Sequence, residues 1–229
     1  MLLVKNVGPR GLLFMYDELA KSDYDCITNV FVIIGTAKYF ICDTYLGSSY
    51  MQEIKDYLEK RHGVKEYIVF NSHSHWDHIW GNSEFKYNLI IAHKKCRELI
   101  KKNGKQELLN HFKDFAREEI EILLPNLTFN DNIIFESEGV EFFYSPGHSI
   151  DSASCYDHKT RLLFVADNVD DPVPTYMDWN NLRAYRDTLR NYLNRDLDCI
   201  VQSHGDQLTI DIVKQNIEYL SKRINNKKV

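Results

Sequence analysis

Cysteine pairs and long apolar runs are both missing from this 229-residue sequence. The five cysteines are scattered and form no CxxC pair, so we expect reduced, mostly buried thiols rather than a disulfide framework. No stretch is long and apolar enough to span a bilayer, and the N-terminus lacks a charged start followed by an apolar run. Together these absences predict a cytoplasmic protein with neither a membrane span nor a signal peptide.

The sequence also lacks a strong charge of either sign. The 28 basic and 33 acidic residues leave a net charge of -5, which gives no field to attract nucleic acid or an anionic membrane. What is present is a hydrophobic content of 44%, enough for a sizeable core. With no linker, repeat or low-complexity segment visible, we expect a single domain over residues 1–229.

Short apolar runs alternate with helical patterns along the chain. β-Hairpins are predicted for residues 26–44, 132–145 and 152–167, and single strands for residues 66–70, 89–92 and 198–203. Helices are predicted for residues 48–62, 93–122, 179–194 and 209–224. The second of these is heavily charged, is expected to break near Asn103 and Gly104, and has the character of an insertion. This order of elements indicates an α/β fold.

The stretch NSHSHWDHIWGN, residues 71–82, directly follows the strand predicted at residues 66–70. His73 and His75 are two residues apart, so their side chains point the same way in an extended segment. Asp77 and His78 belong to the turn that follows and can point elsewhere. Imidazole together with carboxylate suits zinc, iron or manganese, and this arrangement suits two neighbouring metals better than one.

Three further residues of the metal-binding types each follow a predicted strand. His148 comes after EFFYS, Asp167 ends LLFVAD, and His204 comes after CIVQS. A single histidine or aspartate after a strand is ordinary, but these three repeat the placement of the histidine-rich stretch. We therefore expect them to meet it at the rim of a sheet, where functional sites are usually built.

The motif HSHWDH at residues 73–78, with GH at 147–148, Asp167 and HG at 204–205, resembles the metallo-β-lactamase superfamily in order and spacing. Asp43, which follows the first predicted hairpin in FICDT, also matches. The resemblance covers residues 26 to about 220. It implies a four-layer αββα sandwich with the site at one edge of the two sheets.

Carried over residue by residue, the resemblance implies two divalent metal ions, zinc first, with iron or manganese as alternatives. The ligands would be His73, His75 and His148 for the first ion, Asp77, His78 and His204 for the second, and Asp167 as the bridge. Asp43 would orient a ligand or the loop through hydrogen bonds. A turn-forming aspartate after a strand is an equally good interpretation of Asp43.

Departures from particular branches narrow the function that the resemblance implies. Asp167 stands where the zinc β-lactamases with a metal-bound cysteine carry that cysteine, and resembles glyoxalase II, the lactonases and the RNase Z group. The C-terminal helical region of glyoxalase II is not expected, since the chain ends one helix after His204. The first tyrosine after Asp167 is Tyr176, later than in the quorum-quenching lactonases, and no basic surface for tRNA is evident.

The expectation that remains is a metal-dependent hydrolase of a small ester, thioester or lactone. A hydroxide that bridges two metals would attack the carbonyl, while Asp167 fixes the metal spacing and Asp77 can take up a proton. Three alternatives stay open. They are a mononuclear iron oxygenase of the persulfide dioxygenase type, a phosphodiesterase on the same fold, and a non-catalytic binding protein.

Several side chains near the motif are candidates for the walls of a substrate pocket, and core packing is the alternative for the aromatic ones. The aromatic candidates are Tyr45, Trp76, Trp80, Tyr176 and Trp179, and the acidic ones are Asp170 and Asp171. Residues 93–122 could form a lid or an oligomer face, although a solvated helix pair is the simpler interpretation.

Overall fold

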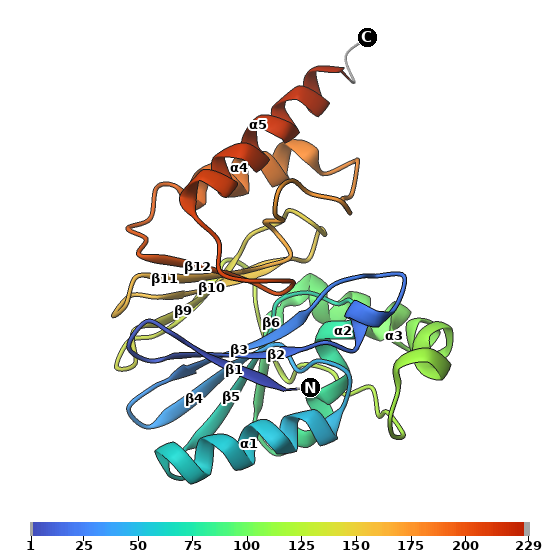
Figure 1. Cartoon of the computed structure of the whole chain (residues 1–229), viewed down its shortest axis with the longest axis vertical. Coiled ribbons are helices and arrows are strands. Elements are labelled where there is room, and N and C mark those ends of the chain that lie inside the picture. The colour runs from blue at the N-terminus through green and yellow to red at the C-terminus, as the bar shows by residue number, and fades with distance from the viewer. Residues whose placement is uncertain (1, 227–229) are drawn as a thin grey trace.

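The computed structural model describes residues 2–226, which form the expected four-layer αββα sandwich. Two β-sheets stack face to face, and helices cover their outer faces (Figure 1). The first sheet contains, in spatial order, β1 (Leu3–Val7), β2 (Gly11–Tyr16), β3 (Thr28–Ile34), β4 (Lys38–Cys42), β5 (Glu66–Asn71), β6 (Leu89–His93) and β7 (Leu127–Phe129). The second contains β12 (Cys199–Gln202), β11 (Leu162–Ala166), β10 (Ala153–Asp157), β9 (Val140–Tyr144) and β8 (Asn132–Phe135).

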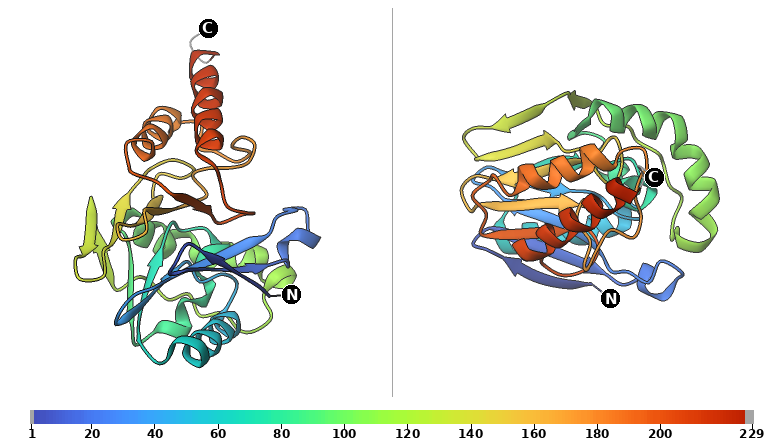
Figure 2. Two further views of the ribbon diagram at one scale, coloured as in Figure 1. Left: turned by 60° about the vertical axis from the view of Figure 1, so that its left-hand side comes forward. Right: turned by 90° about the horizontal axis from the view of Figure 1, so that it is seen from above.

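Helices close the sandwich on both outer faces. Helix α1 (Ser48–His62) covers the first sheet, and α4 (Leu182–Tyr192) with α5 (Ile210–Asn226) covers the second (Figure 1). Helix α3 (Lys94–Phe115) lies at the periphery, as the view from above shows (Figure 2). The short elements are η1 (Leu19–Lys21), α2 (Trp76–Ile79) and η2 (Trp80–Phe85).

Alternating side chains along the strands divide the hydrophobic core into three layers. Along β3, Val30 and Val32 pack with the helices of the first sheet, whereas Phe31 and Ile33 point between the sheets. The ring of Phe31 stacks on that of Phe164 from the second sheet, with centroids 5.8 Å apart. A third layer lies between the second sheet and α4 and α5. Packing on both faces fixes the two sheets, and therefore the loops at their ends, relative to each other.

Strand direction gathers particular loops at one end of the sandwich. Strands β4 and β5 are parallel, as are β11 and β12, and β9 runs in the same direction as β11 because both are antiparallel to β10. The carboxyl ends of these five strands meet at what we call the carboxyl end of the sandwich. The hairpin turns β1–β2, β3–β4, β8–β9 and β10–β11 lie at the opposite end, which we call the turn end.

The predicted hairpins and strands are present, but the expected break in the charged helical segment is wrong. Helix α3 is continuous through Asn103 and Gly104. Gly104 is buried, and a Cβ atom there would lie 3.2 Å from Cγ2 of Ile122, so glycine serves close packing rather than a break. The helix ends at Phe115, earlier than predicted. The patterns also did not predict the β1–β2 hairpin or the short strand β7.

Candidate metal centre

All seven residues predicted as metal ligands lie together at the carboxyl end of the sandwich. The loop after β5 supplies His73 and His75, and the single turn of α2 supplies Asp77 and His78. The other three follow β9, β11 and β12 and are His148, Asp167 and His204. They form two groups, each with its potential ligand atoms within 4.8 Å of one another.

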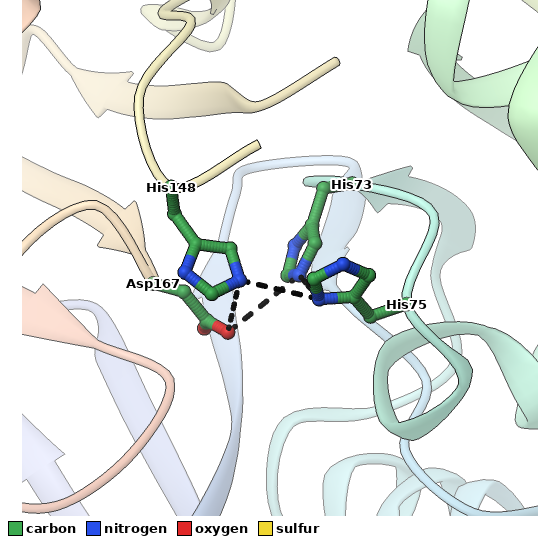
Figure 3. A group of neighbouring side chains, drawn as sticks. All are labelled: His73, His75, His148 and Asp167. Carbon is green, nitrogen blue, oxygen red and sulfur yellow. Dashed lines mark hydrogen bonds and ion pairs between the residues drawn. The ribbon is translucent and has the colours of Figure 1, made fainter. Parts of the chain in front are cut away.

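The first group consists of three histidines and one aspartate from opposite sheets (Figure 3). Nδ1 of His75 lies 3.0 Å from Nε2 of His73 and 3.2 Å from Nε2 of His148. Oδ2 of Asp167 lies 3.5 Å from Nε2 of His73 and 3.7 Å from Nε2 of His148. Three nitrogen atoms and one oxygen atom thus point into a common centre, which is the donor set that a divalent metal such as zinc takes.

The second group shares the same aspartate oxygen. Oδ2 of Asp77 lies 3.4 Å from Nε2 of His78 and 3.4 Å from Nε2 of His204. Oδ2 of Asp167 lies 3.4 Å from each of the same two nitrogen atoms. Asp167 therefore faces both groups, as a residue in the bridging position that the resemblance implied would do.

Four of the five histidines have a partner for the ring nitrogen that faces away from the centre. The partners are the hydroxyl of Ser72 for His73, the carboxylate of Asp43 for His78, the carbonyl of Tyr176 for His148, and the hydroxyl of Thr28 with the carbonyl of Ile27 for His204. Such outer partners fix the ring orientation, as in metal-binding histidines.

Asp43 holds the histidine-rich loop through hydrogen bonds. Its Oδ1 accepts a hydrogen bond from the backbone N–H of Ser72 at 2.7 Å, and its Oδ2 accepts from the Ser72 hydroxyl at 2.7 Å. The same Oδ2 lies 2.9 Å from Nδ1 of His78. Asp43 also has a φ of 65°, so it makes a tight turn as well. The two interpretations of this residue are therefore compatible.

Two buried polar atoms in the centre have no hydrogen-bond partner among the described residues. They are Nε2 of His78 and Oδ1 of Asp167. A buried polar atom without a partner costs about 1–3 kcal/mol, and such atoms are rare in proteins. A bound cation would satisfy lone pairs that converge in this way, so the residues present fit a metal centre.

Electrostatics hold the two aspartates ionised. Burial raises the pKa of Asp77, but His78 and His204 outweigh burial and bring that pKa to about 2. Burial likewise opposes ionisation of Asp167, and the surrounding histidines hold its pKa well below the usual range. Burial lowers the pKa of His148 to about 4, against the pull of Asp167. The same aspartates raise the pKa of His78 and His204 well above the usual value, so metal binding there would release protons.

A glycine precedes His148, the third histidine of the first group, for a steric reason. A Cβ atom on Gly147 would lie 2.3 Å from Oδ1 of Asn168 and 2.7 Å from Cδ2 of Tyr185, so no other residue fits there. The same Asn168 oxygen accepts the backbone N–H of His148 at 2.9 Å. Close contact between the loop after β9 and the loop after β11 therefore sets the position of the third histidine.

A pocket of about 400 Å³ opens over the centre. Among the predicted wall residues, Trp76, Asp170 and Tyr176 line it. The other candidates do not, and these are Tyr45, Trp80, Trp179 and Asp171. Tyr45 stacks on Tyr16 in the core with ring centroids 4.7 Å apart, and Trp80 is fully buried there.

Six lining residues were not predicted from the sequence, and most of them lie far from the motif in the chain. They are Leu19, Tyr24, Cys26, Glu107, His111 and Thr175. The ring of His111, which lies within the charged segment 93–122, stacks on Trp76 with centroids 4.4 Å apart. Helix α3 thus contributes to the pocket wall, which its charge pattern did not reveal.

Comparison with known proteins agrees with the fold. The arrangement defines a four-layer sandwich with a candidate metal centre at one edge. Residues 23–204 match the family model of the metallo-beta-lactamase superfamily, and the chain belongs to that superfamily. Members of the superfamily are mostly metal-dependent hydrolases. A comparison with curated proteins finds no match.

Solved structures with the same fold are distant in sequence. A metallo-beta-lactamase from Pontibacter korlensis is 16% identical with a TM-score of 0.77, and the match covers 96% of this chain and 99% of that one. A metallo-beta-lactamase from Hirschia baltica is 17% identical with a TM-score of 0.77, and the match covers 96% and 97% of the two chains. At these identities the likeness establishes the fold. Within residues 2–226, no helix is long and apolar enough to cross a membrane.

Proposed function

We propose that this protein is a dinuclear-metal hydrolase that cleaves a small ester, thioester or lactone. The observation that supports the proposal is the pair of ligand groups that share Asp167 at the floor of a pocket of about 400 Å³. A pocket of this size suits a small molecule rather than a polymer.

Each residue of the centre has a role in the proposed reaction. The first metal would be held by His73, His75 and His148, the second by Asp77, His78 and His204, and Asp167 would contact both. When bound, such a metal pair polarises a carbonyl group and activates water at neutral pH. The carboxylate of Asp77 lines the pocket and is ionised, so it is placed to accept a proton from the attacking water.

Two observations favour acyl substrates over phosphate diesters and β-lactams. None of the described residues that line the pocket is lysine or arginine, the side chains that usually bind phosphate oxygens. Asp167 stands at the position where the β-lactamases with a metal-bound cysteine carry that cysteine. The acidic and aromatic lining instead suits a compact acyl group.

The test combines metal analysis with a substrate panel. Protein purified without added metal, and then metal-replete protein, is analysed for zinc, iron and manganese, and we expect two ions per chain with zinc foremost. The kcat/KM for generic esters, thioesters and lactones is compared with that for bis(p-nitrophenyl) phosphate and a tRNA precursor. We expect at least about a tenfold preference for the acyl substrates.

Two variants separate the site from contaminating activity. Asp167→Ala should abolish hydrolysis, and Asp56→Ala, on the exposed face of α1, should retain it. A plateau at one metal ion with oxygen consumption would favour the mononuclear oxygenase. A tenfold or greater preference for the phosphate substrates, lost in Asp167→Ala, would favour the phosphodiesterase.

A further inference from the structure

Helix α3 places one carboxylate in the pocket wall that the metal ligands do not use. Glu107 lines the pocket together with His75, Trp76 and Asp77. Its Oε2 atom is buried and has no hydrogen-bond partner among the described residues. A carboxylate oxygen removed from water without a partner is costly, and a cation is the partner that compensates most strongly.

Asp170, the other lining carboxylate that is not among the predicted metal ligands, differs from Glu107 because it has a hydrogen-bond partner. Oδ2 of Asp170 accepts the backbone N–H of Thr175 at 3.1 Å, which holds the loop after β11. Burial raises the pKa of both carboxyl groups, and nearby Asp167 adds to the shift at Asp170. Of these two carboxylates, Glu107 is therefore the one with a buried oxygen that lacks a hydrogen-bond partner among the described residues.

No lysine or arginine among the described residues supplies that partner, and the one nearby basic group is His75, which lowers the pKa of Glu107 but less than burial raises it. The described residues that line the pocket include neither lysine nor arginine. Lys21, Lys113 and Arg117 line a neighbouring groove that shares Tyr24 and His111 with the pocket. Two of these cations have acidic partners already. Lys21 lies 3.1 Å from Asp17, and Arg117 is paired with Glu18.

Aromatic rings line the same pocket, and His111 lies one helical turn after Glu107 on α3. Tyr24 and Trp76 both line it, with ring centroids 5.7 Å apart. The stacking of His111 on Trp76 adds a third ring to this wall. Aromatic faces attract ammonium groups through their quadrupole, and a carboxylate beside them strengthens that attraction.

We infer that the pocket selects acyl substrates that carry an ammonium group, held by Glu107 against Tyr24 and Trp76 while the scissile carbonyl lies over the metal centre. This inference rests on the proposed hydrolase function and specifies its substrate class. Glu107 acts in it as a specificity residue that contacts substrate. An anionic substrate would meet Glu107 and Asp170 without a compensating lysine or arginine.

A set of matched esters tests the inference. The p-nitrophenyl esters of ε-aminocaproic, heptanoic and adipic acid differ at the far end in carrying an ammonium, a methyl or a carboxylate group. We expect kcat/KM to be about ten- to hundredfold higher for the ammonium ester than for the methyl ester, mainly through KM, since a hydrogen bond to a charged group is worth roughly that factor. In Glu107→Gln the ratio should fall close to one. In Glu98→Gln, an exposed position on the same helix, it should keep its wild-type value.

A binding measurement separates this inference from the proposed function. Hexyltrimethylammonium cannot coordinate a metal, and calorimetry should give a Kd about tenfold weaker for metal-replete Glu107→Gln than for the wild type. If no ester is hydrolysed but this difference is found, the hydrolase proposal fails and the ammonium selectivity stands. If esters are hydrolysed but neither the ester ratio nor the Kd depends on Glu107, the inference is overturned. Preference for the adipate ester would overturn it as well.

Discussion

Both ends of the sandwich bury charged side chains. The charges are paired with one another at the turn end and are incompletely paired at the carboxyl end. At the turn end, Arg10 from the β1–β2 turn pairs with Asp157 at the end of β10. Nε of Arg10 donates to Oδ2 of Asp157 at 2.6 Å, and Nη2 donates to the carbonyl of Glu138 at 2.9 Å. The Glu138 carboxylate accepts the backbone N–H groups of Thr36 at 2.7 Å and Ala37 at 2.9 Å. These charges hold four hairpin turns together.

At the carboxyl end, the buried charges converge without completing one another. Four histidine nitrogens face the single oxygen Oδ2 of Asp167, while its Oδ1 and Nε2 of His78 have no hydrogen-bond partner among the described residues. The comparison teaches how to distinguish the two roles of a buried polar cluster. A satisfied cluster stabilises the fold, whereas a cluster whose polar atoms converge without completing one another fits the binding of a ligand.

The largest expected effect is a loss of activity when the ligand groups at the carboxyl end are disrupted. Asp167→Asn should lower kcat/KM for the best acyl substrate by on the order of a thousandfold, because a shared metal ligand supports several kcal/mol of transition-state stabilisation. Elemental analysis should show fewer than two ions per chain. The melting temperature of the metal-free variant should stay within roughly 3 °C of the wild type. Full metal content with unchanged activity would contradict the bridging role.

The same kind of change at the turn end should affect stability instead. Asp157→Asn leaves the largely buried Arg10 without its charged partner and should destabilise the protein by about 3 kcal/mol, which is roughly 6–10 °C in melting temperature. Metal content and activity should not change. The control is Asp196→Asn, whose ion pair with Arg161 is exposed and should contribute less than about 1 kcal/mol. Equal losses in the two variants would refute the comparison.

Asp43 sharpens the comparison, since it is a satisfied residue within the carboxyl end. Asp43→Ala should weaken metal affinity by about 10–100-fold, measured by titration with a competing chelator. Asp43→Asn tolerates the φ of 65° and removes the charge, so it keeps the turn while it disrupts the contacts of Oδ2 with Ser72 and His78. If the residue served the turn alone, Asp43→Asn would keep wild-type metal affinity.

The smallest effect concerns pH at the turn end. Burial alone would raise the pKa of Glu138, but the N–H groups of Ala37 and Thr36 outweigh burial and lower it. A carboxyl group with a lowered folded-state pKa stabilises the protein above its unfolded pKa of about 4.3, and this contribution is lost as the pH falls through the folded-state value. Glu138→Gln should therefore cost about 1 kcal/mol at neutral pH and less below about pH 4. Denaturant melts at both pH values would show no such convergence if the carboxylate did not matter.

The sequence predicts the centre better than its surroundings, for a physical reason. Residues such as His148 and Asp167 follow strands, and parallel strand ends must meet at one edge of a sheet. Trp76 and Trp80 look alike in the sequence, yet one lines the pocket and the other is core, because their directions depend on how α2 and η2 pack. Glu107 could not be placed at all, since α3 meets the motif only in the folded chain.

The first ligand group draws its residues from both sheets, and this has a consequence for how the protein unfolds. His73 and His75 extend from the first sheet, and His148 and Asp167 extend from the second. The sheets are also joined beside the group, where the backbone N–H of Ala153 donates to the carbonyl of Ser72 at 2.8 Å. Neither sheet alone carries a complete set of ligands. Loss of bound metal during unfolding would therefore report when the two sheets separate, whether or not either sheet has itself unfolded.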